Sequence, residues 1–142
     1  MSKIVAVNRK ARYDYQILDT LEGGLVLTGD EIKSIRAGRA NLTASYVKIL
    51  GGEAWLINMN LNNALQPTRT RKVLLHIHEI NKMVGKTTEK GLTLVPLSLY
   101  LKRGRAKIEI GLGKGKKEFD KRETKKNSDI EREIKKEIRN KI

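Results

Sequence analysis

Apolar and polar residues alternate along several short segments of the chain. Within residues 13–17 the odd-numbered positions are apolar, and within residues 106–112 the large apolar residues occupy the even-numbered positions. This period of two residues predicts strands that have one buried face. Similar short apolar segments predict further strands over residues 25–27, 45–50, 53–60 and 92–101.

Glycine and proline indicate irregular positions within these strands. Gly51 and Gly52 stand between two predicted strands, where they can supply the positive φ angles of a tight hairpin. Pro96 lies inside the predicted strand 92–101, and proline has no N–H to donate to a ladder. We therefore expect a bulge or an edge position at Pro96.

Two other segments have apolar residues at the spacing of a helix. One predicted helix begins at Asp30, which can cap it, and ends at Gly38. The other covers roughly residues 72–84 and ends before Gly85. Its inward-facing residues are expected to be Val73, Ile77, Ile80 and Val84. About six short strands together with these helices predict a mainly β protein, built as a small closed or partly open barrel.

The C-terminal part of the chain is strongly basic. The 142 residues carry a formal net charge of +14, and more than half of that charge lies after Leu101. Large apolar residues become rare after Gly113, so we expect a barrel domain over residues 1–113 and a basic tail over 114–142. Within this tail, Ser128 and Glu131 can form a capping box, which predicts an amphipathic helix over 128–142. Its apolar stripe consists of Ile130, Ile134, Ile138 and Ile142.

Composition and spacing argue against several classes of protein. The chain has no cysteine, which excludes disulfides, Cys-ligated zinc and Cys nucleophiles. His76 and His78 would lie about 200° apart on a helix, so they cannot share a ligand, and we expect neither metal nor cofactor. The segment 85–87 lacks the preceding glycine of a phosphate-binding loop. No apolar run approaches the roughly 20 residues that span a bilayer. We expect a soluble, cytoplasmic protein that is not an enzyme.

Three basic clusters, at residues 9–12, 69–72 and 114–117, indicate a polyanionic partner. Such a charge imbalance costs self-repulsion, which binding to a nucleic acid relieves. Of the few aromatic residues, Trp55 is expected in the core. Phe119 lies in the charged tail with no core to join, and it is expected to stack on a base.

Four segments of the chain resemble, in order, the motifs of the SsrA-binding protein family, also called small protein B. They are NRKARYDY at 8–15, GDEIKSIRAG at 29–38, PTRTRKVLL at 67–75 and GKGKKEFDKR at 113–122. The resemblance implies a six-stranded OB-type β-barrel with two or three short helices. It also implies a basic C-terminal tail that is disordered when free and partly helical when bound.

The resemblance also implies a function in trans-translation, the rescue of ribosomes stalled on broken messages. The barrel would bind the tRNA-like domain of transfer-messenger RNA near its elbow and deliver it to the ribosomal A site. Elongation factor Tu would take part indirectly, through the charged transfer-messenger RNA. A monomer without membrane contact is expected.

Family motifs and basic clusters together give the candidate site residues. For transfer-messenger RNA they are Asn8, Arg9, Lys10, Arg12, Glu22, Arg71, Lys72 and Leu74. In the tail, Lys114, Lys116 and Lys117 would follow ribosomal RNA phosphates, and Phe119, Asp120, Lys121 and Arg122 would lie at the decoding centre. The empty messenger channel would hold the helix that carries Ile130, Ile134 and Ile138.

The chain departs from the family pattern at three places. Phe119 stands where the family usually has His or Tyr, Tyr13 replaces a usual histidine, and the segment 61–67 is shorter than usual. Other interpretations remain open from the residues alone. They are a generic basic ribosome- or rRNA-associated OB-fold protein, a membrane-surface protein that uses its Ile-striped helix, an RNA-modifying enzyme, and a tail helix that binds a partner protein.

Overall fold

Nine strands and three helices follow one another along residues 2–88 and 91–116, which the computed structural model describes. Their order is β1 (Ser2–Val7), α1 (Arg9–Asp14), β2 (Tyr15–Leu25), α2 (Gly29–Arg36), β3 (Ala40–Asn41), β4 (Tyr46–Leu50), β5 (Glu53–Ile57), β6 (Asn60–Leu61), β7 (Arg71–Leu74), α3 (Ile77–Thr87), β8 (Leu92–Lys102) and β9 (Arg105–Gly115). Strands β3 and β6 form a separate two-stranded sheet.

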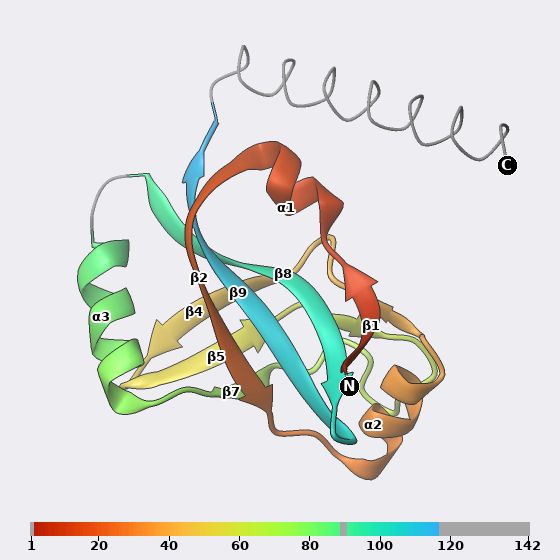
Figure 1. Cartoon of the computed structure of the whole chain (residues 1–142). Coiled ribbons are helices and arrows are strands. Elements are labelled where there is room, and N and C mark those ends of the chain that lie inside the picture. The colour runs from red at the N-terminus through yellow and green to blue at the C-terminus, as the bar shows by residue number, and fades with distance from the viewer. Residues whose placement is uncertain (1, 89–90, 117–142) are drawn as a thin grey trace, which may run out of the picture.

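Six of these strands form a closed ring (Figure 1). Neighbouring strands are antiparallel in the order β8-β4-β5-β7-β2-β9, and β9 pairs again with β8 to complete the ring. β1 lies outside the ring, along the same edge of β8 that meets β4. The ladder between β4 and β8 has a single registered pair, Val47 and Leu94. The prediction of a six-stranded barrel with short helices is confirmed.

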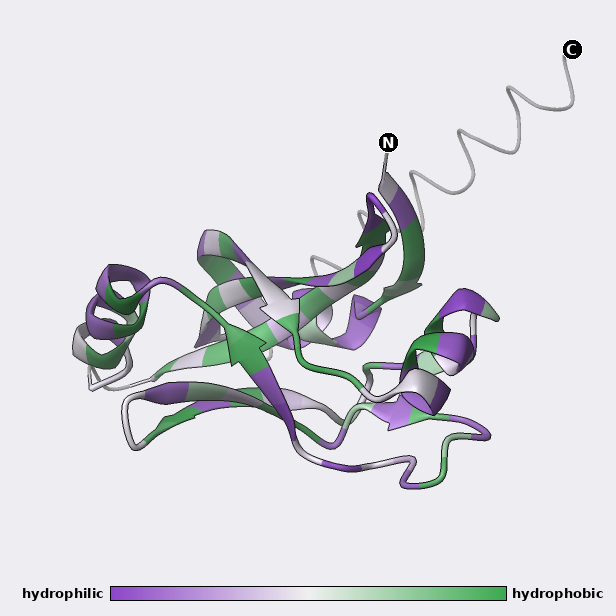
Figure 2. Cartoon of the chain, turned by 90° about the horizontal axis from the view of Figure 1, so that it is seen from below, coloured by the Kyte–Doolittle hydropathy of each residue, from purple (hydrophilic) through white to green (hydrophobic). Residues whose placement is uncertain are grey.

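The core fills the inside of this ring. In β9, the even-numbered residues Ala106, Ile108, Ile110 and Leu112 are all buried, as their alternation predicts. In β5, the buried residues Ala54 and Leu56 likewise alternate with residues that are half-buried. Helices α2 and α3 lie on opposite sides of the barrel in both views, and α1 lies beside the ends of β8 and β9 (Figures 1 and 2).

The two irregular positions predicted from glycine and proline are confirmed. Gly51 and Gly52 have φ angles of 60° and 75° in the hairpin between β4 and β5. The β8–β9 ladder shifts its register between Pro96 and Ser98, which is the expected bulge. Gly38 has a φ of 74° just after α2 and donates its N–H to Ile35, so it ends this helix as predicted.

The predicted strand over residues 13–17 is wrong at its start, because Tyr13 and Asp14 belong to the six-residue helix α1. Asn8 caps this helix: its side-chain Oδ1 accepts a hydrogen bond of 3.1 Å from the N–H of Ala11. Strand β2 then begins at Tyr15. So short a helix has too few residues to show a helical period, and its cap decides its position.

The predicted helix over residues 72–84 is wrong in its first turn. Val73 belongs to strand β7 and is buried opposite Leu25 and Ala54, and the helix α3 begins only at Ile77. Its buried residues are Ile80 and Met83, whereas Ile77 and Val84 are exposed.

Three smaller predictions of local structure are also wrong. Gly85 lies inside α3, which continues to Thr87. The N-cap of α2 is Thr28 and not Asp30. Trp55 is half-buried on the outer face of the barrel, because its neighbours Ala54 and Leu56 face the core.

Gly23 marks the closest approach between two strands of the barrel. A Cβ atom at this position would lie 2.5 Å from Cγ1 of Val73, whereas one at the neighbouring Gly24 would have no atom nearer than 3.7 Å. The branched side chain of Val73 is held in the core and cannot move aside easily. The absence of a side chain at Gly23 therefore allows β2 to pack against β7.

We predict that Gly23→Ala lowers the free energy of unfolding by about 1–3 kcal/mol, the usual cost of overpacking. Gly24→Ala is the matched control and should leave stability unchanged or raise it by about 0.4–1 kcal/mol, because alanine restricts the unfolded chain. Urea unfolding followed by circular dichroism measures both. Equal stability of the two variants would contradict the close packing at Gly23.

Candidate nucleic-acid interface

A buried carboxylate organises the loop that carries the basic cluster 69–72. Glu31, in the first turn of α2, has a side chain that is 2% exposed. One of its oxygens accepts hydrogen bonds from the N–H of Thr28 at 2.9 Å and from Arg69 Nη2 at 2.5 Å. Its other oxygen accepts from Arg71 Nε at 2.5 Å. The carboxylate is thus paired with two cations, as a buried charge requires.

Arg71 is fully buried and holds the chain around it through its remaining donors. Nη1 donates to the carbonyl of Met59 at 2.7 Å, and Nη2 donates to the carbonyls of Gln66 and Pro67 at 3.1 Å each. The short segment 61–67 is also tied to α2, because the N–H of Leu65 donates to Asp30 at 2.8 Å. Arg71 therefore does not reach solvent, and it fixes the position of the backbone that forms the surface above it.

These hydrogen bonds shift the ionisation of Glu31. Burial alone would raise the pKa of its carboxyl group, but the hydrogen bonds from Arg69, Thr28 and Arg71 outweigh burial and lower the pKa from 4.5 to about 2. Glu31 therefore stays ionised at neutral pH and keeps its two arginines in place.

Asn8 is likewise buried and joins three parts of the chain. Besides capping α1, its Nδ2 donates to the carbonyl of Pro96 in β8 at 2.9 Å and to that of Leu42 at 3.2 Å. The predicted site residue Asn8 thus fixes α1 on the barrel, and the exposed side chains of that helix are the ones that face solvent.

The structure brings together two basic clusters that are far apart in the sequence. Arg9, Lys10 and Arg12 are exposed on α1, and Lys114 is exposed near the end of β9. Lys116 connects the two segments, because its N–H donates to the carbonyl of Asp14 at 2.9 Å and its Nζ to that of Arg12 at 3.1 Å. Four cations from two predicted clusters therefore share one region of the surface with Lys116.

Glu22 lies on the outer face of β2, in a row of charged side chains with Lys102 and Glu109, here called the Glu22 row. Its carboxylate accepts a hydrogen bond from the hydroxyl of Tyr100 and lies 3.8 Å from Nζ of Lys102. Burial, followed by this hydrogen bond, raises the pKa of Tyr100 above its usual value. Directly opposite Glu22 on β9 is Glu109, which pairs with Arg12 of α1 at 3.2 Å. Glu22 and the basic helix therefore belong to one continuous face.

Leu74 and Lys72 lie on β7, beside the end of β2. Leu74 is 54% exposed and pairs with Gly24, two residues after Glu22. Lys72 pairs with Glu53 at 2.9 Å. Sequence reasoning overlooked Tyr100 and Lys102, although the alternation along β8 places both on the outer face.

The remaining predicted site residues lie outside the described residues. They are Lys117, Phe119, Asp120, Lys121, Arg122, Ile130, Ile134 and Ile138, together with the rest of the predicted helix over 128–142. Among the described residues, no helix has the length and hydrophobicity needed to cross a membrane.

A closed antiparallel barrel with exposed cations gathered on one face defines a class of small β proteins that commonly bind nucleic acids. The comparison with known families is more specific. The model of the SmpB protein family matches residues 5–140, and the chain belongs to this family.

Relatives cover nearly the whole chain. The SsrA-binding protein of Enterococcus faecalis is 51% identical over 97% of this chain and 94% of its own length. That of Carboxydothermus hydrogenoformans is 53% identical over 98% of both chains. A solved structure titled "tmRNA-SmpB: a journey to the center of the bacterial ribosome" matches with a TM-score of 0.67 and 45% identity, over 80% of this chain and 85% of the other.

We predict that stability depends on pH through Glu31. Since the folded-state pKa is depressed from 4.5 to about 2, the stabilisation is fully present above about pH 4.5 and is lost as pH falls towards 2. This contribution is about 3 kcal/mol. Glu31→Gln should lower the free energy of unfolding by about 3–5 kcal/mol at neutral pH, because it leaves Arg71 buried without its anion.

The difference in the free energy of unfolding between the wild type and Glu31→Gln should therefore decrease as pH falls from 5 to 3. Urea unfolding at each pH measures it. Glu53→Gln is the control, since it removes only an exposed ion pair with Lys72 and should cost less than about 1 kcal/mol at every pH. A difference in the free energy of unfolding between the wild type and Glu31→Gln that does not vary with pH would contradict the lowered pKa of Glu31.

Proposed function

We propose that this chain is the RNA-binding adaptor of trans-translation. It binds the tRNA-like domain of transfer-messenger RNA and delivers it to the A site of stalled ribosomes that lack a codon. The observation that carries the proposal is the convergence of the cations of α1 with Lys114 and Lys116 beside the Glu22 row. Membership of the SmpB family and the 45% identical chain in the tmRNA-SmpB structure support it.

On this proposal the barrel residues divide into surface contacts and positioning residues. The exposed side chains of Arg9, Lys10 and Arg12 meet RNA phosphates, which fix the orientation of the protein on the RNA. Asn8 and Arg71 are buried and act indirectly: Asn8 holds α1, and Arg71 holds the loop that precedes β7.

Glu22, Lys72 and Leu74 complete the contact surface for transfer-messenger RNA. The carboxylate of Glu22 accepts hydrogen bonds from a base edge while it keeps Lys102 in place. Leu74 offers an exposed apolar contact beside it, and Lys72 adds a positive charge on the same strand.

The tail carries the second half of the proposed function. Lys114, Lys116 and Lys117 follow ribosomal RNA phosphates, and Phe119, Asp120, Lys121 and Arg122 occupy the decoding centre. Ile130, Ile134 and Ile138 lie on a helix in the empty messenger channel. The protein works in the cytoplasm without catalysis of its own, and elongation factor Tu meets it only through the charged transfer-messenger RNA.

We predict that Arg9→Ala with Lys10→Ala weakens binding to the tRNA-like domain. The slope of the logarithm of the binding constant against the logarithm of the salt concentration should also become less negative by about two, one for each lost phosphate contact. Lys33→Ala with Arg36→Ala is the matched control, because both side chains are exposed on α2, on another side of the barrel. Filter binding at several salt concentrations measures both effects.

The triple variant Asp120→Ala, Lys121→Ala, Arg122→Ala should keep nearly full RNA affinity and abolish peptide tagging on stalled ribosomes in a purified translation system. Equal loss of RNA affinity in the triple variant and the α1 variant would contradict the division between barrel and tail. Equal affinity of the wild type for the tRNA-like domain and for an unrelated RNA of the same length would favour a generic rRNA-associated protein.

A further inference from the structure

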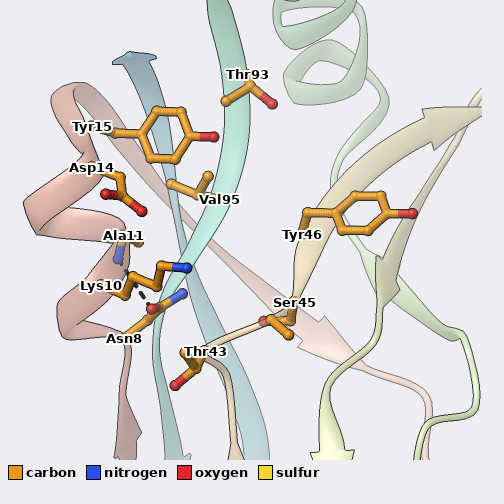
Figure 3. A pocket seen from close by; sticks show the side chains of 11 residues that line it. Asn8, Lys10, Ala11, Asp14, Tyr15, Thr43, Ser45, Tyr46, Thr93 and Val95 are labelled. Carbon is orange, nitrogen blue, oxygen red and sulfur yellow. Dashed lines mark hydrogen bonds between the residues drawn. The ribbon is translucent and has the colours of Figure 1, made fainter. Parts of the chain in front are cut away.

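A groove of about 410 Å³ lies between α1 and the segment that leads into β4 (Figure 3). One wall is formed by α1 and the first residue of β2, the other by residues 43–46, and Thr93 and Val95 of β8 lie between them. A volume of this size is within the range of small-molecule sites. Neither Glu22 nor Leu74 contributes to this groove, which distinguishes it from the Glu22 row.

Both walls of the groove are fixed by the buried Asn8. Its Nδ2 joins β8 at Pro96 to the carbonyl of Leu42, just before the second wall. Ser45 strengthens the same wall, because its hydroxyl donates to the carbonyl of Leu42 at 2.5 Å. Such crosslinks keep the groove open in the free protein and reduce the entropic cost of filling it.

Tyr15 reaches into the groove because β9 has a glycine beneath it. A Cβ atom at Gly113 would lie 2.9 Å from Cβ of Tyr15, so only glycine leaves room for this side chain. The ring extends towards Thr93 on one side of the groove, and Tyr46 lies on the other side (Figure 3). Tyr46 is 42% exposed. Two aromatic residues thus line the groove: the ring of Tyr15 lies in it, and Tyr46 stands on the opposite wall with its ring directed away from α1 (Figure 3).

Polar groups complete the lining. The ammonium group of Lys10 and the carboxylate of Asp14 extend from α1 towards the groove, and the hydroxyl groups of Thr43 and Thr93 lie at its edges (Figure 3). Within the described part of the chain, the side chains of Lys10 and Thr93 make no hydrogen bond to another residue. Aromatic rings, a cation and hydroxyl groups are together suited to a base joined to a phosphate.

We propose that this groove holds one unstacked nucleotide of a bound RNA, with its base beside Tyr15 and Tyr46 and its phosphate on Lys10. The proposal rests on the RNA-binding function above and adds a site for a single base beside the phosphate contacts. The exposed cations Arg9 and Arg12 lie on the same helix as Lys10 and attract a polyanionic strand to this side of the barrel. A base that is already unpaired enters at the lowest cost, so loops and single strands are the favoured ligands.

The test compares variants of Tyr46, which is exposed and can be replaced with little effect on folding. In the full chain, Tyr46→Ala should weaken binding to the tRNA-like domain about tenfold, the scale of one base–aromatic stack. Tyr46→Phe should bind like the wild type. The salt dependence should stay unchanged in both, because no phosphate contact is lost. Leu50→Ala is the matched control, exposed on the same strand but outside the groove, and should bind normally.

A second measurement keeps the test independent of the natural RNA. Addition of a short oligouridylate to the full chain should shift the amide resonances of Tyr46 and Thr93, and Tyr46→Ala should abolish the shift at Thr93. Unchanged affinity of Tyr46→Ala, or an oligonucleotide that leaves both resonances in place, would overturn the groove site. The proposed function would fail separately, if the wild type did not prefer the tRNA-like domain over other RNA.

Discussion

The ion pair between Glu31 and Arg71 is the interaction on which the arrangement of the surface depends. It joins α2 to the first residue of β7, and the other donors of Arg71 hold the carbonyls of Met59, Gln66 and Pro67. A buried ion pair is tolerated only when each partner is fully hydrogen-bonded, and here the surrounding backbone meets that condition. The course of the chain between α2 and β7 is therefore fixed by charge as well as by packing, and β7 in turn positions Lys72 and Leu74.

Asn8 has the corresponding role on the other part of the interface. It caps α1, joins β8 to the loop before β4, and thereby fixes both the basic helix and the groove that contains Tyr15. The two buried polar residues among the candidate site residues thus act from the interior. On the proposed function, we expect a mutation at either position to change RNA binding without removing an RNA contact, so measurements of stability must accompany measurements of affinity.

The sequence predicted the barrel because strand alternation is a local signal, and β9 shows it most clearly. It failed where local signals were short or ambiguous: α1 depends on one cap, and Val73 fits a helical spacing although it lies in a strand. Strict alternation would have placed Trp55 opposite Ala54 and Leu56, on the outer face. The basic clusters of the site could be predicted because charge is visible in the sequence. The burial of Arg71 could not be predicted, because it depends on an ion pair with Glu31, forty residues away.

Specific binding of transfer-messenger RNA is tested most directly by recovery of the full chain from its cells through an N-terminal tag. The RNA that accompanies the protein is then sequenced. We expect strong enrichment of one transfer-messenger RNA, and loss of that enrichment when Arg9 and Lys10 are replaced with alanine. A bulk mixture of ribosomal and transfer RNA, unchanged by those substitutions, would contradict it.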